Sequence, residues 1–219
     1  MEKKNSNYIK GFTMTYTLRH EENAFYTHQP ALLKALEIST GPVLELGCGD
    51  GSTELLHKYC KKHNRELISV ESDYDWMSPY IEKFNSTDHK FRYTNDWATI
   101  SDEMSEKHWG LVFIDQNSWD GRAYSFKKLQ DSADYLVLHD CDYFPINGLL
   151  GKEISPLIGE GKIGERNWDS DIQYWKEFHP LKFLCYTGKV HTGPPTLIAS
   201  NTHPCEQIEV DFTIKNVDI

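Results

Sequence analysis

The chain has 219 residues and a mass of 25.4 kDa, which fits a single domain spanning residues 1–219. Hydrophobic residues make up 39% and charged residues 26%, a composition that excludes a disordered or fibrous protein. The 33 acidic residues outnumber the 23 lysines and arginines, and a net charge of -10 disfavours a nucleic-acid partner, because phosphates attract basic surfaces.

The cysteines and the apolar runs indicate the cellular compartment of the protein. The five cysteines are scattered and form no CxxC pair, which argues against a disulfide framework and a zinc ribbon. No apolar run approaches the ~18 residues of a membrane span, and no apolar stretch follows the polar start MEKKNSN. We therefore expect a cytoplasmic protein with reduced thiols and no membrane partner.

The first predicted elements are helices. Residues 1–40 are expected to form a helical cover over the mouth of a sheet. Within them, Glu21–Glu37 carries Phe25, Leu32, Leu33 and Leu36 and predicts one or two helices that break at Pro30.

Five short apolar or β-branched runs follow, and each predicts a strand. A polar stretch of helical length, Ser52–His63, separates the first two and places apolar residues at three- and four-residue spacing. Strands that alternate with helices predict an α/β fold with a parallel sheet covered on both faces. The five runs are Pro42–Leu46, Glu66–Glu71, Lys90–Thr94, Trp109–Asp115 and Asp134–Asp140.

The pattern changes after the fifth run. Residues 141–180 predict an irregular insertion over the site. The runs Leu181–Tyr186 and Thr196–Ser200 then predict a terminal hairpin. Within residues 205–219, apolar residues alternate along Gln207–Ile214, which predicts one extra edge strand.

A glycine-rich turn follows the first strand. In VLELGCGDGST, Glu45, Gly47, Gly49 and Gly51 stand at two-residue spacing between a strand and a helix. Glycines let the backbone approach a ligand, and the free amides at the start of the next helix suit a carboxylate or phosphate. An acid, Glu71, ends the second strand twenty residues after the last glycine.

The spacing of the glycines separates two classes of cofactor. A dinucleotide loop has the pattern GxGxxG, which would place its third small residue at Ser52, whereas the third glycine here is Gly51. The ExGxGxG pattern resembles the first motif of class I S-adenosylmethionine-dependent methyltransferases, over roughly Val43 to Ser200. The resemblance implies a Rossmann-like, doubly wound, seven-stranded sheet, mostly parallel, with an antiparallel terminal hairpin.

The resemblance also implies which residues contact S-adenosylmethionine. Glu45 and the backbone at Gly47 and Gly49 would hold the methionine end, and Glu71 would accept both ribose hydroxyls.

The same resemblance implies which residues lie near the adenine and the methyl group of the cofactor. Asp96 and Trp97, directly after the third strand, would contact the adenine, although Asp96 is equally a candidate cap for the next helix. Asp115 would lie beside the methyl donor.

The segments FIDQNSWDGRAYSFKKL and YLVLHDCD resemble a subgroup of small-molecule methyltransferases related to antibiotic-tailoring and catechol-type enzymes. Some members bind a divalent metal between acids that end strands four and five. Asp115 and Asp140, completed by Asp142 or His139, are then expected to hold Mg²⁺, or the acids are solvated or helix-capping carboxylates. This chain departs from both subgroup patterns, because it has His139-Asp140-Cys141 at the end of strand five.

A metal-free reaction needs a general base, and His139 is the natural candidate beside Asp115 and Asp140. It can equally point into the packing of the sheet. Arg122 is expected to hold a substrate carboxylate or phosphate, or to pair with an acid. Trp175 is expected in a wall that selects the substrate, or in the core face of a helix.

The sequence thus predicts a methyltransferase that acts on a small molecule, most readily at oxygen. One alternative is a protein that binds the cofactor without methyl transfer. A nucleic-acid methyltransferase is disfavoured, because 115–118 reads DQNS where amino-directed enzymes carry (N/D)PP(Y/F). A nicotinamide-dependent oxidoreductase is disfavoured by Ser52 and by the terminal hairpin. The methyl acceptor and the oligomeric state do not follow from the sequence.

Overall fold

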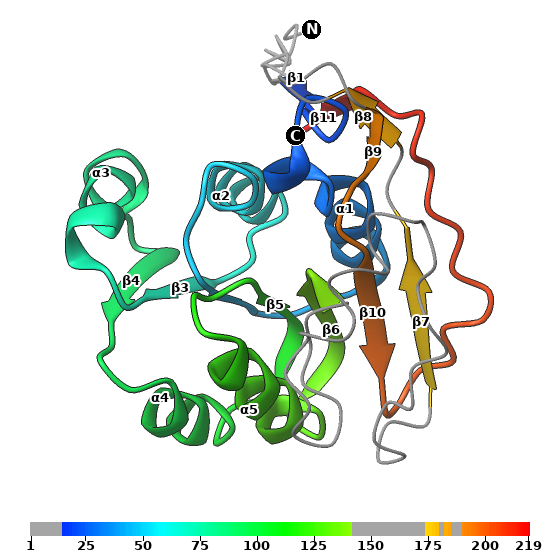
Figure 1. Cartoon of the computed structure of the whole chain (residues 1–219). Helices are drawn as coiled ribbons and strands as arrows, with labels where there is room; N and C mark the ends of the chain where they lie inside the picture. The colour runs from blue at the N-terminus through cyan, green and yellow to red at the C-terminus, as the bar shows by residue number, and fades with distance from the viewer. Residues whose placement is uncertain (1–14, 142–173, 180–181, 185–189) are drawn as a thin grey trace, which may run out of the picture.

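The computed structural model describes residues 15–141, 174–179, 182–184 and 190–219. A central sheet of seven strands has the order β4-β3-β2-β5-β6-β10-β7. The first five are parallel neighbours, whereas β10 is antiparallel to both β6 and β7, which confirms the expected fold class (Figure 1). The strands are β2 (Val43–Leu46), β3 (Leu67–Glu71), β4 (His89–Tyr93), β5 (Trp109–Ile114), β6 (Ala133–His139), β7 (Tyr174–Phe178) and β10 (Thr196–Ser200).

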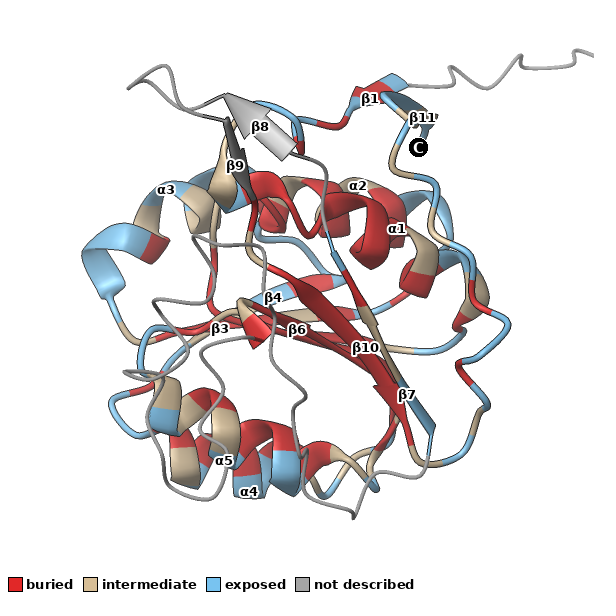
Figure 2. Ribbon diagram, turned by 45° about the vertical axis from the view of Figure 1, so that its right-hand side comes forward, coloured by how far each residue is buried: buried red, intermediate tan, exposed pale blue. Residues whose placement is uncertain are grey.

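Helices cover both faces of this sheet (Figure 2). One layer holds α1 (Gln29–Ile38) and α2 (Thr53–Lys62), and the other holds α4 (Trp97–Met104) and α5 (Trp119–Leu129). The helix α3 (Tyr74–Phe84) packs beside α2 and β4. Because side chains alternate along a strand, Val43 packs in the first layer and Leu44 in the second. Both faces of the central strands are therefore buried, as parallel sheets require.

The N-terminal segment matches the expected helical cover in part. A short 3-10 helix, η1 (Ala24–Tyr26), precedes α1. Pro30 lies in the first turn of α1, where its missing N–H costs no hydrogen bond, so the helix begins around this proline and the predicted break at Pro30 is wrong. Residues 1–14 of the expected cover lie outside the described residues.

The first strand of the terminal hairpin is residues 174–178, and not the predicted run Leu181–Tyr186. The partner of β10 is β7, which lies in the stretch expected to be irregular, and residues 174–178 run antiparallel to 196–200. From the predicted strand Leu181–Tyr186, the described residues form β8 (Lys182–Leu184), which pairs with β9 (Val190–Thr192) in a separate sheet. Both runs have strand propensity, and tertiary pairing decides between them.

The predicted edge strand at Gln207–Ile214 is wrong. This segment forms no strand, and its apolar side chains pack against the core on the α1 and α2 side of the sheet. The chain then ends in β11 (Asn216–Asp218), which pairs with β1 (Thr15–Thr17). A segment packed through one face has the same alternation as a strand, and that similarity produced the error.

No helix within the described ranges is both long enough and apolar enough to cross a membrane.

Candidate functional site

The carboxyl ends of the parallel strands meet at one edge of the sheet. Parallel pairing places the end of β2 between those of β3 and β5, and the end of β6 beside that of β5. The glycine turn, Glu71, Asp115 and His139 therefore gather at that edge, where open α/β sheets bind their ligands.

The three glycines of the turn have different surroundings. Gly47 has a φ of +94°, and a Cβ there would lie 2.6 Å from backbone atoms of Asp115 and Gln116. A Cβ on Gly51 would overlap the carbonyl oxygen of Phe25. A Cβ on Gly49 would have no described atom within 4 Å. Two glycines thus permit close packing within the protein, and the third leaves open space above the turn.

Glu45 lies beneath this turn and is fully buried. Its carboxylate accepts hydrogen bonds from Ser52 at 2.6 Å, from Thr53 at 2.9 Å and from the hydroxyl of Ser69. Burial raises the pKa of Glu45 to about 7, although the three hydroxyl donors favour the charged form. Both carboxylate oxygens of Glu45 are thus bonded within the protein, and its expected contact with the methionine end stays a prediction.

Glu71 ties the turn to the end of β3. One carboxylate oxygen accepts from the backbone N–H of Cys48 at 3.0 Å, and the other from those of Ser72 at 2.6 Å and Asp73 at 3.0 Å. These bonds fix the carboxylate next to the glycine turn. Its expected contact with the ribose stays a prediction.

Asp96 caps α4, the alternative that the sequence left open. Its carboxylate accepts from the backbone N–H of Ala98 at 3.0 Å and from the hydroxyl of Thr99 at 2.5 Å. Trp97 is buried in the layer of α4 and α5. Both residues follow the third parallel strand as expected, and their contact with adenine stays a prediction.

A cavity of about 260 Å³ opens at the ends of β5 and β6. Its rim is apolar, and its polar wall contains several of the residues singled out from the sequence. The lining residues are Ala24, Phe25 and Pro194 on the apolar side, and Asp115, Asn117, Arg122, His139 and Asp140 on the polar side.

Arg122 binds both acids of this cavity. Its guanidinium lies 2.9 Å from Asp115 Oδ1 and 3.1 Å from Asp140 Oδ2. It also donates to the backbone carbonyls of Gln116 at 2.6 Å, His139 at 2.9 Å and Asp115 at 3.1 Å. All three nitrogens are thus engaged within the protein, and a substrate anion would have to displace one of these bonds. Of the two roles that the sequence left open for Arg122, the structure shows the second, pairing with an acid.

The same arrangement does not fit the expected Mg²⁺ site. The guanidinium of Arg122 contacts both Asp115 and Asp140, so a cation that bridges these two acids would have to displace it. Asp142, the third expected ligand, lies outside the described residues. We therefore assign no step of the reaction to Mg²⁺.

His139 points toward the site, and its ring is held at both nitrogens. Nδ1 lies 3.2 Å from Asp115 Oδ1, and Nε2 lies 3.1 Å from Thr27 Oγ1. Burial alone would lower the pKa of His139, but Asp140 and Asp115 outweigh it and raise the pKa above its ordinary value. Burial likewise opposes ionisation of Asp115, yet His139 and Arg122 lower its pKa to about 2.

His28 is a site residue that sequence reasoning missed. It lies just before α1 and is buried, with its ring edge-on to His139 at 4.5 Å between centroids and 4.8 Å from Phe113. Neither ring nitrogen has a hydrogen-bond partner among the described residues. Burial, with His139 nearby, lowers the pKa of His28 to about 3. No strand end or motif marks His28, so the sequence offered no signal for it.

Trp175 lies away from this cavity. It sits on the edge strand β7 opposite Ala199, whereas Phe178 and Thr196 lie level with His139 at the site. Trp175 is in a strand, so neither the expected wall of the site nor a helix face describes its position.

Comparisons with known proteins support the fold. No family model and no curated protein matches the sequence. A solved spermidine synthase, in complex with a transition-state analogue, is 12% identical with a TM-score of 0.51, covering 85% of this chain and 63% of its own. The chain shares with this structure a Rossmann-like α/β fold with a mostly parallel seven-stranded sheet.

Two other solved structures are similar in the same way. A SAM-dependent methyltransferase from Anabaena variabilis is 12% identical, with 80% of this chain and 85% of that chain covered and a TM-score of 0.47. An rRNA methylase from Streptococcus thermophilus is 9% identical, with 78% and 93% covered and a TM-score of 0.49. Likenesses of this size do not assign an activity, so the function must be argued from the site.

Proposed function

We propose that the protein is an S-adenosylmethionine-dependent methyltransferase that methylates a hydroxyl group of a small molecule. The observation that carries the proposal is the open space above Gly49 beside a cavity with an imidazole-carboxylate pair in its wall. Methyl transfer is an in-line displacement at the sulfonium methyl, so the protein must align two molecules and remove one proton.

The cofactor would lie along the carboxyl edge of the sheet. Its methionine end would occupy the open space above Gly49, and the ribose would lie near Glu71. Gly47 packs directly against the backbone at Asp115, and Asp115 lines the cavity. This contact supports a methyl group that points from the turn into the cavity.

His139 would accept the proton of the substrate hydroxyl. With Nδ1–H donating to the ionised Asp115, Nε2 keeps a free electron pair. The Thr27 hydroxyl near Nε2 has a second acceptor, the Ala24 carbonyl at 3.0 Å, so it can turn away when a substrate hydroxyl donates to Nε2. Asp115 holds the ring and stabilises its charged form.

The size of the cavity and the charge of the chain favour a small acceptor. A volume of about 260 Å³ is below the ~300 to 1,000 Å³ of sites that enclose drug-sized ligands. The apolar rim suits an uncharged body on the molecule that carries the hydroxyl. With a net charge of -10, a nucleic-acid substrate is disfavoured.

Calorimetry with S-adenosylmethionine and its demethylated product tests the cofactor assignment. We expect micromolar-range binding to the wild type and none to Gly49→Val, because the valine fills the open space above the turn. The free energy of unfolding of the variant should stay near that of the wild type, since no described atom lies within 4 Å of the new Cβ. Tight binding of NADH in place of S-adenosylmethionine would overturn the assignment.

Transfer of a tritiated methyl group from the cofactor to a metabolite pool tests the reaction. Once an acceptor is found, His139→Ala should lower turnover by ~10² to 10⁴, and the loss should shrink as the pH rises and the acceptor ionises unaided. The matched control is His108→Ala, which removes an exposed histidine paired with Asp134 at 3.0 Å. Cofactor binding without any transfer would support the binding-protein alternative.

A further inference from the structure

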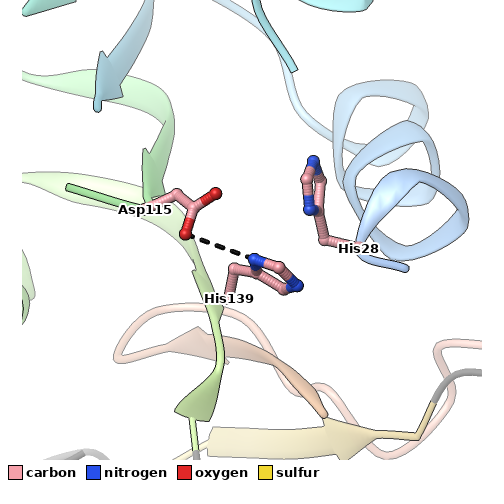
Figure 3. A group of neighbouring side chains, drawn as sticks. All are labelled: His28, Asp115 and His139. Carbon is pink, nitrogen blue, oxygen red and sulfur yellow. Dashed lines mark hydrogen bonds and ion pairs between the residues drawn. The ribbon is translucent and has the colours of Figure 1, made fainter. Parts of the chain in front are cut away.

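We propose that His28, Asp115 and His139 form a binding site for one divalent transition-metal ion such as Zn²⁺. The site differs from the expected Mg²⁺ site in its ligands, because it uses two imidazoles and a single carboxylate. Figure 3 shows the two rings and the carboxylate facing a shared space at the ends of β5 and β6, with His28 reaching it from the start of α1.

The distances between the three groups are close to those of a metal site. One ligand atom from each residue lies within 4.8 Å of the other two. His139 Nδ1 and Asp115 Oδ1 are already 3.2 Å apart. Two ligands on one Zn²⁺, with bonds of ~2.0 to 2.2 Å at near-tetrahedral angles, lie roughly 3.3 to 3.5 Å apart. Bringing the most distant pair from 4.8 Å to this separation needs a shift of about 1.4 Å.

The state of His28 points to a missing partner. Its ring is fully enclosed, and neither nitrogen makes a hydrogen bond within the described part of the chain. An unpaired buried polar group costs ~1 to 3 kcal/mol and calls for a ligand, a water or an ion. A Cβ on Gly51 would lie 2.8 Å from His28 Cε1, so the glycine turn makes room for this ring.

The hydrogen bonds around His139 have the arrangement that metal-binding histidines use. The other nitrogen of His139, Nε2, lies 3.1 Å from Thr27 Oγ1, and that hydroxyl lies 3.0 Å from the Ala24 carbonyl. With metal on Nδ1, Nε2–H donates to Thr27, which donates in turn to Ala24. Such a chain fixes the tautomer and the orientation of the ring. Arg122 Nη2 lies 2.9 Å from the same carboxylate oxygen, Asp115 Oδ1, so a metal on that oxygen would share it with the guanidinium.

The charge and the donor types favour a transition metal over Mg²⁺. Asp115 and Asp140 share the single charge of Arg122, which leaves a net charge of -1 to attract a cation. Imidazole ligands favour Zn²⁺, Fe²⁺ and Co²⁺, whereas Mg²⁺ prefers oxygen ligands and water. Three protein ligands leave a coordination position open, and Asp115 and His139 both line the cavity.

This inference rests on the proposed function only for the position of the acceptor. The two forms of His139 exclude each other. In the metal-free form Nε2 is the base of the proposed function. In the metal-bound form the metal occupies Nδ1, the proton stays on Nε2, and His139 is not a base. The open coordination position would then hold the acceptor's oxygen and lower the pKa of its hydroxyl.

Metal titration of the full-length, metal-stripped protein tests the site without cofactor or acceptor. We expect one equivalent of Co²⁺ to bind and to give the visible absorption bands of an ion with a low coordination number. Zn²⁺ should displace the bound Co²⁺, and Mg²⁺ should not. Asp115→Asn and His28→Leu should each weaken Zn²⁺ binding at least tenfold. The matched control is His57→Ala, which removes a second histidine pair, His57 Nδ1 to His89 Nδ1 at 3.1 Å, and should leave the affinity unchanged.

His28→Leu is a suitable variant because leucine fills the apolar environment beside Phe113 without an unpaired nitrogen. Its unfolding curve establishes that it folds, and His139→Gln is the second variant should it not. The proposal is overturned if the wild type binds no stoichiometric metal, or if binding survives in all three ligand variants. Calorimetry with S-adenosylmethionine on the same samples tests the proposed function separately.

Discussion

At the scale of single residues, the glycine turn separates two roles that look alike in sequence. Gly47 and Gly49 stand two residues apart in the same motif. The backbone at Gly47 is left-handed and touches the end of β5, whereas Gly49 is open on the side of its missing Cβ. One glycine therefore serves the fold, and the other is available to a ligand.

Alanine at each position should separate these roles. Gly47→Ala combines a positive φ with a backbone contact of 2.6 Å, so we expect it to lower the free energy of unfolding by at least ~2 kcal/mol. Gly49→Ala adds a Cβ in open space and should change that free energy by less than ~1 kcal/mol. Urea unfolding of both variants measures the difference, and equal losses would contradict the packing described for Gly47.

At the scale of elements, Arg122 joins α5 to the ends of β5 and β6. Arg122 donates hydrogen bonds to backbone carbonyls at the ends of both strands. It also forms ion pairs with Asp115 and Asp140, the acids that directly follow these strands. It also stacks on Trp119 at 4.5 Å. The shape of the cavity wall therefore depends on one side chain.

Removing this guanidinium should be costly. In Arg122→Met, Asp115 and Asp140 lose their shared partner, and we expect a loss of ~3 kcal/mol or more in the free energy of unfolding near pH 7. Arg122→Lys should recover only part of it, because one ammonium cannot reach all of these acceptors. Denaturant unfolding measures both. A lysine variant as stable as the wild type would show that charge alone matters here.

At the scale of the whole molecule, a buried polar network runs through one side of the fold. It starts at Glu45 on β2, passes through Ser69 on β3 and His89 on β4, and ends at His57 on α2. Burial raises the pKa of Glu45 to about 7 and, together with His57, lowers the pKa of His89 to about 3. Proton binding in this network is therefore linked to folding.

The two groups have opposite effects on stability between pH 4.5 and 6.5. The folded state keeps the proton of Glu45 where the unfolded chain releases it, so its contribution to stability falls as the pH rises from 4.5 to 7. The folded state keeps His89 neutral where the unfolded chain binds a proton, so that contribution falls as the pH drops from 6.5 toward 3.

Glu45→Gln should remove only the first effect. Relative to this variant, the wild type should lose up to about 3 kcal/mol in the free energy of unfolding between pH 4.5 and 7. The decline of the wild type below pH 4.5 should remain in the variant. Urea unfolding at a series of pH values measures both slopes, and parallel curves for the two proteins would refute the raised pKa of Glu45.

The parallel part of the sheet and the position of the glycine turn follow from the amino-acid sequence alone. Five apolar runs and the helix after the turn appear where they were predicted, within a residue or two. These features are local, because the period of the side chains and the glycine spacing are set by neighbours along the chain. Parallel pairing then brings residues such as Asp115 and His139 to one edge, so their meeting was also predictable.

The strand pairing at the end of the sheet and the positions of several site residues are set by tertiary packing. Contacts across the folded chain decide whether residues 174–178 or 181–186 pair with β10. They also decide that residues 207–214 pack on the core and do not join a sheet. The position of Arg122 between two acids and that of His28 against His139 depend on how α5 and α1 dock on the sheet. Local patterns specify which face of a segment is buried, but partners distant in sequence are chosen by the packing energy of the whole fold.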